Sequence, residues 1–297
     1  MYHKPALLEE SLDALAVRPE GTYVDVTFGG GGHARAIMER LGSGRLIAFD
    51  QDEDAVSNTL KDERFFLVNR NFRYMIHFLR YLEAVPVDGI LADLGISSHQ
   101  IDTSERGFSI RFDGPIDLRM NRRLKVSARD ILNEWEPSRL ARLFAEYGEL
   151  EQAHRIARAI ESARKVKSLE TTGDLKSAVM HMVPSHKLNQ FLAQVFQALR
   201  IQVNNELDAL QELLTQSLDV LKPGGRLAVI SYHSLEDRMV KNFFRAGNVE
   251  GKINKDFYGN VVSGIKALNQ KVICPGERES LENPRSRSAR LRVGVKL

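Results

Sequence analysis

Tyr23-Val24-Asp25-Val26-Thr27-Phe28-Gly29-Gly30-Gly31-Gly32-His33 is the stretch that decides the fold of this chain. It reads as a short strand rich in β-branched residues that runs directly into four glycines. Residues 34–41 have a helical pattern that stops at Gly42, and residues 45–50 form a second apolar strand that ends in Asp50. A strand, a glycine turn, a helix and a second strand in this order are typical of a nucleotide-binding βαβ unit.

The glycines and two acidic residues indicate the kind of ligand. Glycine allows the backbone to approach a ligand closely, and the amides at the start of the next helix are free to donate. Asp50 lies 18 to 21 residues beyond the glycines, near the spacing at which a strand-end acid meets ribose hydroxyls. Asp25 inside the first strand would repel a pyrophosphate, so S-adenosylmethionine, which carries a sulfonium and an amine, is favoured over NAD.

Strands and helices continue to alternate after this unit, with further strands expected over 65–68 and 87–94. The alternation predicts an α/β fold with a parallel, doubly wound sheet. Ligands bind such sheets at the carboxyl ends of the strands. Four segments fall at those ends and are expected to meet in one crevice, namely Gly29 to His33, Asp50, Asn71-Phe72 and Asp93.

The alternation stops near Ile101. Residues 102–124 predict a long ordered loop, and four helical stretches follow, over 128–135, 137–147, 152–166 and 172–182. We therefore expect a discontinuous α/β domain over 1–101 and 191–297, with an inserted helical domain over 102–190. In the second part of the α/β domain, the pattern predicts one long helix over 189–221, a strand over 226–232 and an edge strand at the tail, over 289–293.

Composition sets further bounds. The chain has 297 residues, of which 43% are hydrophobic and 27% charged, as in an ordinary globular protein. No apolar run approaches the roughly 18 residues of a membrane span and no signal peptide is apparent, so a cytoplasmic protein without a membrane partner is expected. The single cysteine, Cys274, and the scattered histidines predict no disulfide and no metal site. The net charge is +3, with basic residues unevenly placed, as a polyanionic partner would require.

Several longer motifs resemble one known family, the RsmH (MraW) family of S-adenosylmethionine-dependent ribosomal RNA methyltransferases. They run through the whole chain, at Asp25 to His33, Asp93 to Ser98 with Gln100, Arg106 to Ser109, Asp113 to Met120, Phe196 to Ile201, Ile230 to Arg238 and Asn283 to Ser288. Departures are few: His99 stands where the family usually has proline, Asn121 where it often has aspartate, and Tyr232 where it usually has phenylalanine.

The resemblance implies a class I, Rossmann-like methyltransferase fold with an inserted helical domain for substrate recognition. It implies transfer of a methyl group to the exocyclic N4 amine of a cytidine in the decoding centre of 16S rRNA, in the small ribosomal subunit. The cofactor-binding residues that it implies are Gly31, Gly32 and His33 at the methionine end, Asp50 at the ribose, Phe72 against the adenine, and Asp93 and Gln100 closing the site.

The lone pair of the cytidine N4 amine is delocalised into the base. Hydrogen-bond acceptors near the amine protons would localise it on the nitrogen, so methylation needs such acceptors. Asp93 and the carbonyls of residues 94–97 are the first candidates, and His233 is a second candidate proton acceptor whose alternative role is to cap the next helix. Methylation at cytosine C5 would need a cysteine nucleophile, for which Cys274 is badly placed. The Asp-Pro-Pro-Tyr motif of many amino-methyltransferases is absent.

Contact with RNA phosphates is expected from Arg285, Arg287 and Arg290, with help from basic residues of the inserted domain. A competing interpretation from another class is a non-catalytic module that binds the cofactor during ribosome assembly. An NAD-linked oxidoreductase is disfavoured by Asp25. The sequence leaves open whether the protein is a homodimer.

Overall fold

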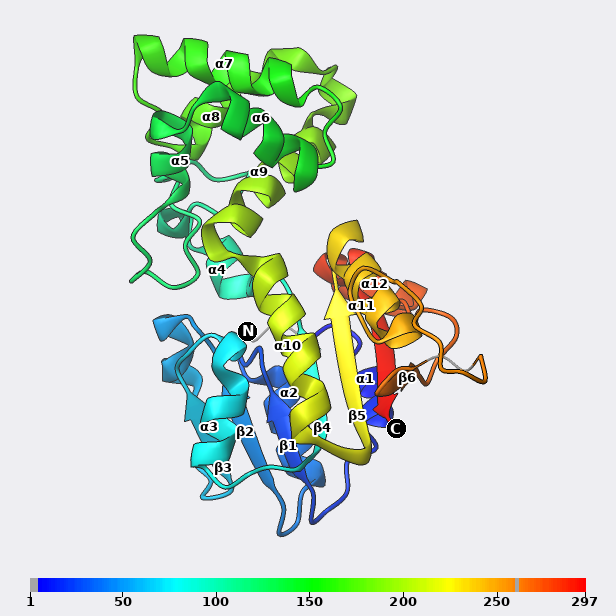
Figure 1. Ribbon diagram of the computed structural model, residues 1–297. Helices are drawn as coiled ribbons and strands as arrows, with labels where there is room; N and C mark the ends of the chain where they lie inside the picture. Colours follow the sequence, from blue (N-terminus) through cyan, green and yellow to red (C-terminus); the bar gives the residue numbers. More distant parts are fainter. Residues whose placement is uncertain (1–4, 260–261) are drawn as a thin grey trace. The chain divides into compact units, whose positions relative to one another are not determined.

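The computed structural model describes residues 5–259 and 262–297 (Figure 1). The chain divides into two compact units: one comprises the chain up to Gly95 together with Leu207–Leu297, and the other is Ile96–Glu206. The second unit is therefore longer at both ends than the insertion expected over 102–190. One reason is that residues 191–203 contribute Phe191, Leu192, Val195, Leu199 and others to the apolar core of the second unit.

The first unit is built on a seven-stranded sheet. The strands are β1 (Thr22–Asp25), β2 (Arg45–Phe49), β3 (Phe65–Val68), β4 (Val87–Asp93), β5 (Leu221–Ser231), β6 (Ile265–Ala267) and β7 (Arg290–Lys296). Their order is β3-β2-β1-β4-β5-β7-β6, with the first five parallel, β7 antiparallel to β5, and β6 antiparallel to β7. The winding reverses between β1 and β4, which is where ligand crevices form in such sheets. The predicted doubly wound α/β fold is confirmed.

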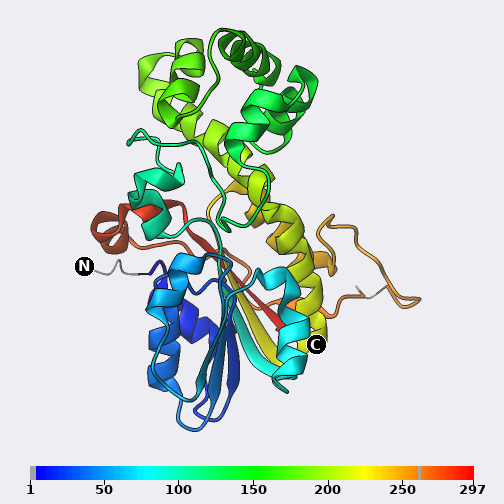
Figure 2. The same cartoon turned by 90° about the vertical axis from the view of Figure 1, so that its left-hand side faces the viewer.

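Helices cover both faces of this sheet (Figure 2). On one face lie α1 (Leu8–Leu15) and α2 (Gly32–Arg40), and on the other lie α3 (Met75–Tyr81), α10 (Glu206–Val220) and α11 (Ser234–Ala246). Successive strand residues point to opposite faces, so Tyr23 packs in the α1 and α2 core while Val24 packs in the other. With both faces buried, these strands read as nearly continuous apolar runs.

The tail strand was predicted at an edge, and that was wrong. β7 lies between β5 and β6, and the edge is the three-residue strand β6, which the sequence pattern did not indicate. Leu291 and Val293 alternate with arginines, which indicates that one face of the strand is more buried than the other. This alternation carries no information about what pairs with either edge of that strand.

The single helix expected over 189–221 is two helices. α9 spans Leu188–Asn204 and α10 spans Glu206–Val220, with Asn205 between them in the left-handed conformation at φ 49°. Asparagine adopts this conformation more readily than most residues do. The apolar stripe is thereby divided, since α9 packs into the core of the second unit and α10 packs onto the sheet.

The second unit is helical, as predicted. Besides α9 it contains α4 (Ser98–Asp102), α5 (Ala128–Glu134), α6 (Pro137–Glu146), α7 (Ala153–Val166) and α8 (Thr172–Val179). Their apolar faces share one core, which includes Ile131, Leu140, Phe144, Ile156 and Leu175. Within the parts of the chain that the structure describes, no helix combines the length and the apolar composition needed to cross a membrane.

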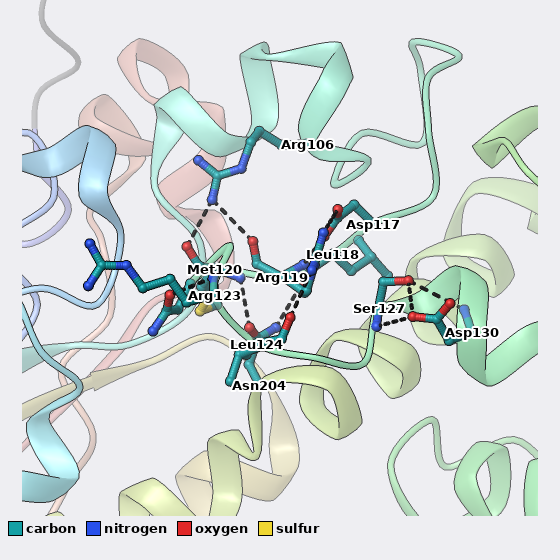
Figure 3. Close-up of polar contacts among 11 residues, drawn as sticks. Arg106, Asp117, Leu118, Arg119, Met120, Arg123, Leu124, Ser127, Asp130 and Asn204 are labelled. Atoms are coloured by element: carbon teal, nitrogen blue, oxygen red, sulfur yellow. Dashed lines mark hydrogen bonds and ion pairs between the residues drawn. The ribbon is translucent and has the colours of Figure 1, made fainter.

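Buried polar contacts hold the segment that was expected to be a long loop (Figure 3). Arg106 is only 2% exposed, and its Nη2 donates to the carbonyls of Arg119, at 3.1 Å, and Met120, at 2.9 Å. The Asn204 amide donates to the carbonyl of Leu118 and accepts from the amide of Met120, both at 2.8 Å. Two of the family-like motifs, at 106–109 and 113–120, therefore help to brace this unit.

Two of the basic residues of the inserted domain form ion pairs within the same unit. Arg119 forms an ion pair with Asp117 at 2.6 Å, and Arg129 pairs with Glu170 at 2.7 Å. The guanidinium of Arg119 also donates to the carbonyl of Leu124. Arg119 therefore serves the fold of the segment directly.

Candidate cofactor and catalytic site

The carboxyl ends of β1, β2, β4 and β5 bring most of the predicted residues of the first unit to one edge of the sheet. Asp25 ends β1 and pairs in register with Ala48 of β2 and Leu91 of β4. Asp93 ends β4 and pairs with Ile230 of β5. The glycine loop, Asp50 and His233 follow directly after β1, β2 and β5, as the parallel topology requires.

The glycine loop is closed by Asp50. One carboxylate oxygen, Oδ2, accepts the amide of Gly29 at 2.7 Å, and the other, Oδ1, accepts the amide of Asp52 at 2.8 Å. The side chain of Asn58 donates to the carbonyl of Gly29 at 3.0 Å. These bonds hold the Asp50 carboxylate beside the loop, where a strand-end acid can accept ribose hydroxyls.

The start of α2 requires glycine. Gly31 precedes the helix with φ 73°, and a Cβ there would lie 2.9 Å from the ring of Phe28. No side chain caps the helix. The amides of Gly32 and His33, at the start of α2, are therefore available to a ligand. The amide of Gly31, the third residue that the sequence suggested, donates instead to the carbonyl of Phe28 at 2.7 Å.

Asp25 is a buried acid with one unsatisfied oxygen. Its side chain is 1% exposed; Oδ1 accepts the amide of Thr27 at 3.0 Å, and Oδ2 has no hydrogen-bond partner among the described residues. Burial raises the pKa of Asp25 to about 7, with a further contribution from the charge of Asp50. Because an unpaired buried carboxylate is costly, this oxygen suits a cationic donor. Sequence reasoning used Asp25 to choose the cofactor without including it among the site residues.

Asp93 is held by a group that the sequence analysis missed. The phenol of Tyr232 donates to Asp93 Oδ1 at 2.8 Å, and 21% of the Asp93 side chain stays exposed. The pKa of Asp93 is raised to about 7: burial raises it most, the carboxylates of Asp25 and Glu236 add to that effect, and the hydrogen bond from Tyr232 opposes it. The only signal in the sequence was the departure from phenylalanine at position 232.

His33 is a neutral imidazole in this site. It is 5% exposed, and burial lowers its pKa to about 4. Nε2 lies 3.1 Å from the carbonyl of Ala6, and because a carbonyl only accepts, we assign the proton to Nε2. Nδ1 is then an acceptor, and its distance of 3.7 Å from Asp93 Oδ2 is too long for a hydrogen bond.

His233 has the capping geometry that the sequence left open. It precedes α11, and its Nδ1 accepts the amide of Glu236 at 3.4 Å. In return, Glu236 Oε2 accepts the amide of Tyr232 at 2.9 Å, and Oε1 lies 3.2 Å from His233 Nε2. Glu236 is 2% exposed. The reciprocal arrangement resembles a capping box and fixes the backbone that carries Tyr232.

The remaining cofactor candidates lie in different places. Phe72 is partly buried in the turn after β3, against the core under α3 and α10. Asn71 precedes it and donates to the Gln51 side chain at 2.9 Å, which ties this turn to the residue after Asp50. Gln100 belongs to the second unit, where it is 4% exposed and closes a capping box with Ser97. A role for Gln100 at the cofactor stays a prediction.

The three arginines expected to contact RNA are exposed. Arg285 and Arg287 lie in the turn Pro284–Ser288, on either side of the buried Ser286. Arg290 begins β7 and pairs in register with Ser231, at the carboxyl end of β5, so it lies at the same edge as the acids. Its guanidinium is 3.3 Å from Asp237 and its side chain is 51% exposed.

Comparisons with known proteins identify the family of this chain. The sequence profile of the MraW methylase family matches residues 1–297. A curated protein of Bacteroides fragilis (strain YCH46), named ribosomal RNA small subunit methyltransferase H, is 54% identical over 99% of this chain and 97% of its own length. One of the same name from Flavobacterium johnsoniae is 51% identical over 100% of this chain and 98% of its own. The chain therefore belongs to the MraW methylase family and is an S-adenosylmethionine-dependent methyltransferase.

Proposed function

We propose that this chain methylates the small-subunit ribosomal RNA, at the exocyclic N4 amine of a cytidine in the decoding centre. The observation that carries the proposal is the pair of strand-end carboxylates, the buried Asp25 and the partly exposed Asp93, beside an uncapped glycine loop. The small-subunit ribosomal RNA as substrate is supported by the names of relatives that match almost the whole chain. The N4 amine in the decoding centre is what the resemblance of the sequence motifs implies. A ribosomal substrate places the enzyme in the cytoplasm.

The residues present fit S-adenosylmethionine. The unpartnered Asp25 Oδ2 suits its ammonium or sulfonium, the amides of Gly32 and His33 at the start of α2, which Gly31 precedes, suit its carboxylate, and the Asp50 carboxylate suits the ribose hydroxyls. Bound there, the cofactor supplies a methyl group activated by a sulfonium. Phe72 against the adenine and Gln100 as a closing residue complete the set of contacts that we propose.

Asp93 is the acceptor that we propose for the target amine. Its Oδ1 is held by Tyr232, which leaves Oδ2 to accept a proton of the N4 amine and localise the nitrogen lone pair. The carboxylate must be ionised to do so, and its raised pKa of about 7 keeps it a competent base near neutral pH. His233 has Nδ1 engaged by the cap, so its contribution to proton transfer is the weaker proposal.

RNA is held, we propose, by Arg285, Arg287 and Arg290 and by exposed basic residues of the second unit. A target base must leave its stack to reach an amine-methylating pocket, and phosphate contacts on both sides of it would hold the strand. The helical unit would then serve in substrate recognition. A homodimer is compatible with this function and is not required by it.

The test is methyl incorporation from labelled S-adenosylmethionine into small subunits or 16S rRNA from cells that lack this gene. Nucleoside mass spectrometry should find N4-methylated cytidine at one position of the decoding centre. The Asp93→Asn variant serves as the control and should bind 16S rRNA like the wild type but transfer little methyl group. Cofactor binding by the wild type without incorporation into any subunit or rRNA form would favour the non-catalytic assembly module instead.

A further inference from the structure

Two aromatic side chains stand almost fully in solvent in the loop that follows α11. Phe257 is 97% exposed and Tyr258 is 85% exposed, and Phe257 is the most exposed large hydrophobic residue in the described part of the chain. Their rings meet edge to face, with centroids 5.6 Å apart and planes at 87°. Large apolar groups presented in this way usually mark an interaction site.

The base of this loop, residues 248–259, is built onto the end of α11. Asn242 donates to the carbonyl of Val249 at 3.0 Å, and Arg245 donates to that of Gly251 at 3.3 Å. The amide of Lys252 donates to the Asn248 side chain at 3.0 Å. Gly251 has φ +72°, and a Cβ there would lie 2.8 Å from the Asn242 side chain, so the close approach requires glycine.

The tip of the loop has its own turn. The Asp256 carboxylate accepts the amide of Tyr258 at 2.8 Å, and the Asp256 carbonyl accepts the amide of Gly259 at 3.0 Å. These bonds order the backbone on both sides of Phe257. The rings are thus presented by hydrogen-bonded backbone, so less conformational entropy is lost when a ligand binds them.

The chain on either side of the two rings is rich in basic residues. Between positions 241 and 271 the chain has two acidic residues, Glu250 and Asp256, and six basic ones, all exposed: Lys241, Arg245, Lys252, Lys255, Lys266 and Lys271. Lysine is depleted at protein–protein interfaces. Aromatic faces beside basic side chains are the combination that binds single-stranded nucleic acid.

We propose that the 248–259 loop is a second RNA-binding site, which stacks a base of the ribosomal RNA substrate on Phe257 or Tyr258 while Lys252 and Lys255 contact its phosphates. The proposal rests on the proposed function, because the RNA in question is the substrate of methylation. RNA is favoured over an anionic membrane surface because the substrate proposed for the site is itself RNA.

The 248–259 loop lies far from the site proposed for methyl transfer. α11 starts at the carboxyl end of β5 and runs for 13 residues, about 20 Å, before the loop begins. β6, which follows the loop, pairs with the end of β7 that lies beside Arg226, at the amino end of β5. A nucleotide on the loop is therefore distant from the methylated one, so only a large substrate can engage both sites.

The experiment compares the wild type with the variant Phe257→Ala/Tyr258→Ala. We expect KM for intact small subunits to rise roughly 5- to 150-fold when one base no longer stacks. The turnover number and the Kd for S-adenosylmethionine should stay within twofold, and a short decoding-centre RNA should be methylated as before. Tyr81→Ala is the matched control, because Tyr81 is 83% exposed on α3, far along the sheet order from β6.

A second variant tests the charges. Lys252→Gln/Lys255→Gln should reduce the slope of log affinity for 16S rRNA against log salt by about 0.7 for each phosphate that the loop no longer neutralises. Unchanged KM for small subunits in the aromatic variant would overturn the proposal. The proposal would also be overturned if the aromatic variant lost self-association or binding to anionic lipid vesicles while its RNA binding stayed intact.

A failure of the proposed function can be distinguished from a failure of the RNA-binding loop. A wild-type protein that methylates no RNA would refute the function, and filter binding of labelled 16S rRNA would still compare the wild type with both loop variants. Equal binding by all three proteins would then overturn the RNA-binding loop as well. Weaker binding by both loop variants would support the loop while the catalytic proposal falls.

Discussion

Replacing Tyr232 with phenylalanine tests the arrangement around Asp93 with a single atom. Tyr232→Phe removes the hydroxyl that donates to Asp93 Oδ1 at 2.8 Å. The ring stays, so its packing against Gly95, where a Cβ would lie 3.4 Å from the ring, is kept. Phenylalanine is also the usual residue of the family at this position, so the variant should fold.

The expected effect follows from the groups that face Asp93. Asp25 of β1 and Glu236 of α11 raise its pKa, the neutral His33 of α2 lies 3.7 Å away, and the phenol of Tyr232 is the donor that lowers it. A hydrogen bond to a charged acceptor contributes about 1.5–3 kcal/mol, which corresponds to roughly one to two pKa units. Because 21% of Asp93 is exposed, water can replace part of this bond, and we expect the pKa to rise by about one unit.

The sign of the pH effect is fixed by the role of the carboxylate. If the ionised form of Asp93 accepts the amine proton, the rate rises with pH through the pKa of Asp93. A higher pKa in Tyr232→Phe should therefore move this rise to higher pH. Methyl transfer to small subunits at saturating S-adenosylmethionine, measured from pH 5.5 to 9, gives the midpoint. The matched control is Tyr81→Phe, which removes an exposed hydroxyl on α3.

Two results would refute this reasoning. An unchanged midpoint in Tyr232→Phe, with Asp93→Asn still inactive, would show that the hydroxyl does not influence the working carboxylate. A loss of rate at every pH without a shift would indicate that Tyr232 acts through packing alone. Calorimetric titration of S-adenosylmethionine as a function of pH follows the same carboxylate without any RNA.

Three further results are expected. Asp50→Ala should weaken S-adenosylmethionine binding roughly 10- to 150-fold, measured by calorimetry; part of that loss comes from the loop amide of Gly29, and equal affinity would contradict the ribose assignment. Asp25→Asn should stabilise the cofactor-free protein more at pH 8 than at pH 5, by about 2.5 kcal/mol, because a folded-state pKa of about 7 makes ionisation oppose folding as pH rises from about 4 to 7. The thermal midpoints at the two pH values check this, and a constant difference would count against it. Arg285→Gln/Arg287→Gln should flatten the salt dependence of 16S rRNA binding by about 0.7 for each phosphate left without its arginine, and an unaltered slope would exclude both arginines.

Local patterns predicted much of the fold. Strands β1 to β4 and helices α5 to α8 lie close to where periodicity, glycine turns and capping residues placed them. Each of these elements has its signal within about ten residues of sequence, and burial on both sheet faces makes the apolar runs hard to miss. β6 was not predicted because it has three residues, of which only Ile265 is buried.

The errors have a common cause in long-range pairing. The place of β7 between β5 and β6 depends on partners that lie far away in the chain. The break at Asn205 divides an apolar stripe that looks continuous, because its two halves pack in different cores.

The sequence by itself determined the fold class, the cofactor and the edge of the sheet at which the strand-end acids meet. Glycine turns, strand-end acids and alternating strands and helices are local signals, and parallel topology places them together without further information. Only the tertiary structure decided how the acids are held: the Tyr232 phenol on Asp93, 139 positions away, and the unpartnered oxygen of Asp25. Hydrogen bonds and burial depend on which side chains meet in space, and those contacts set the pKa values on which the chemistry depends.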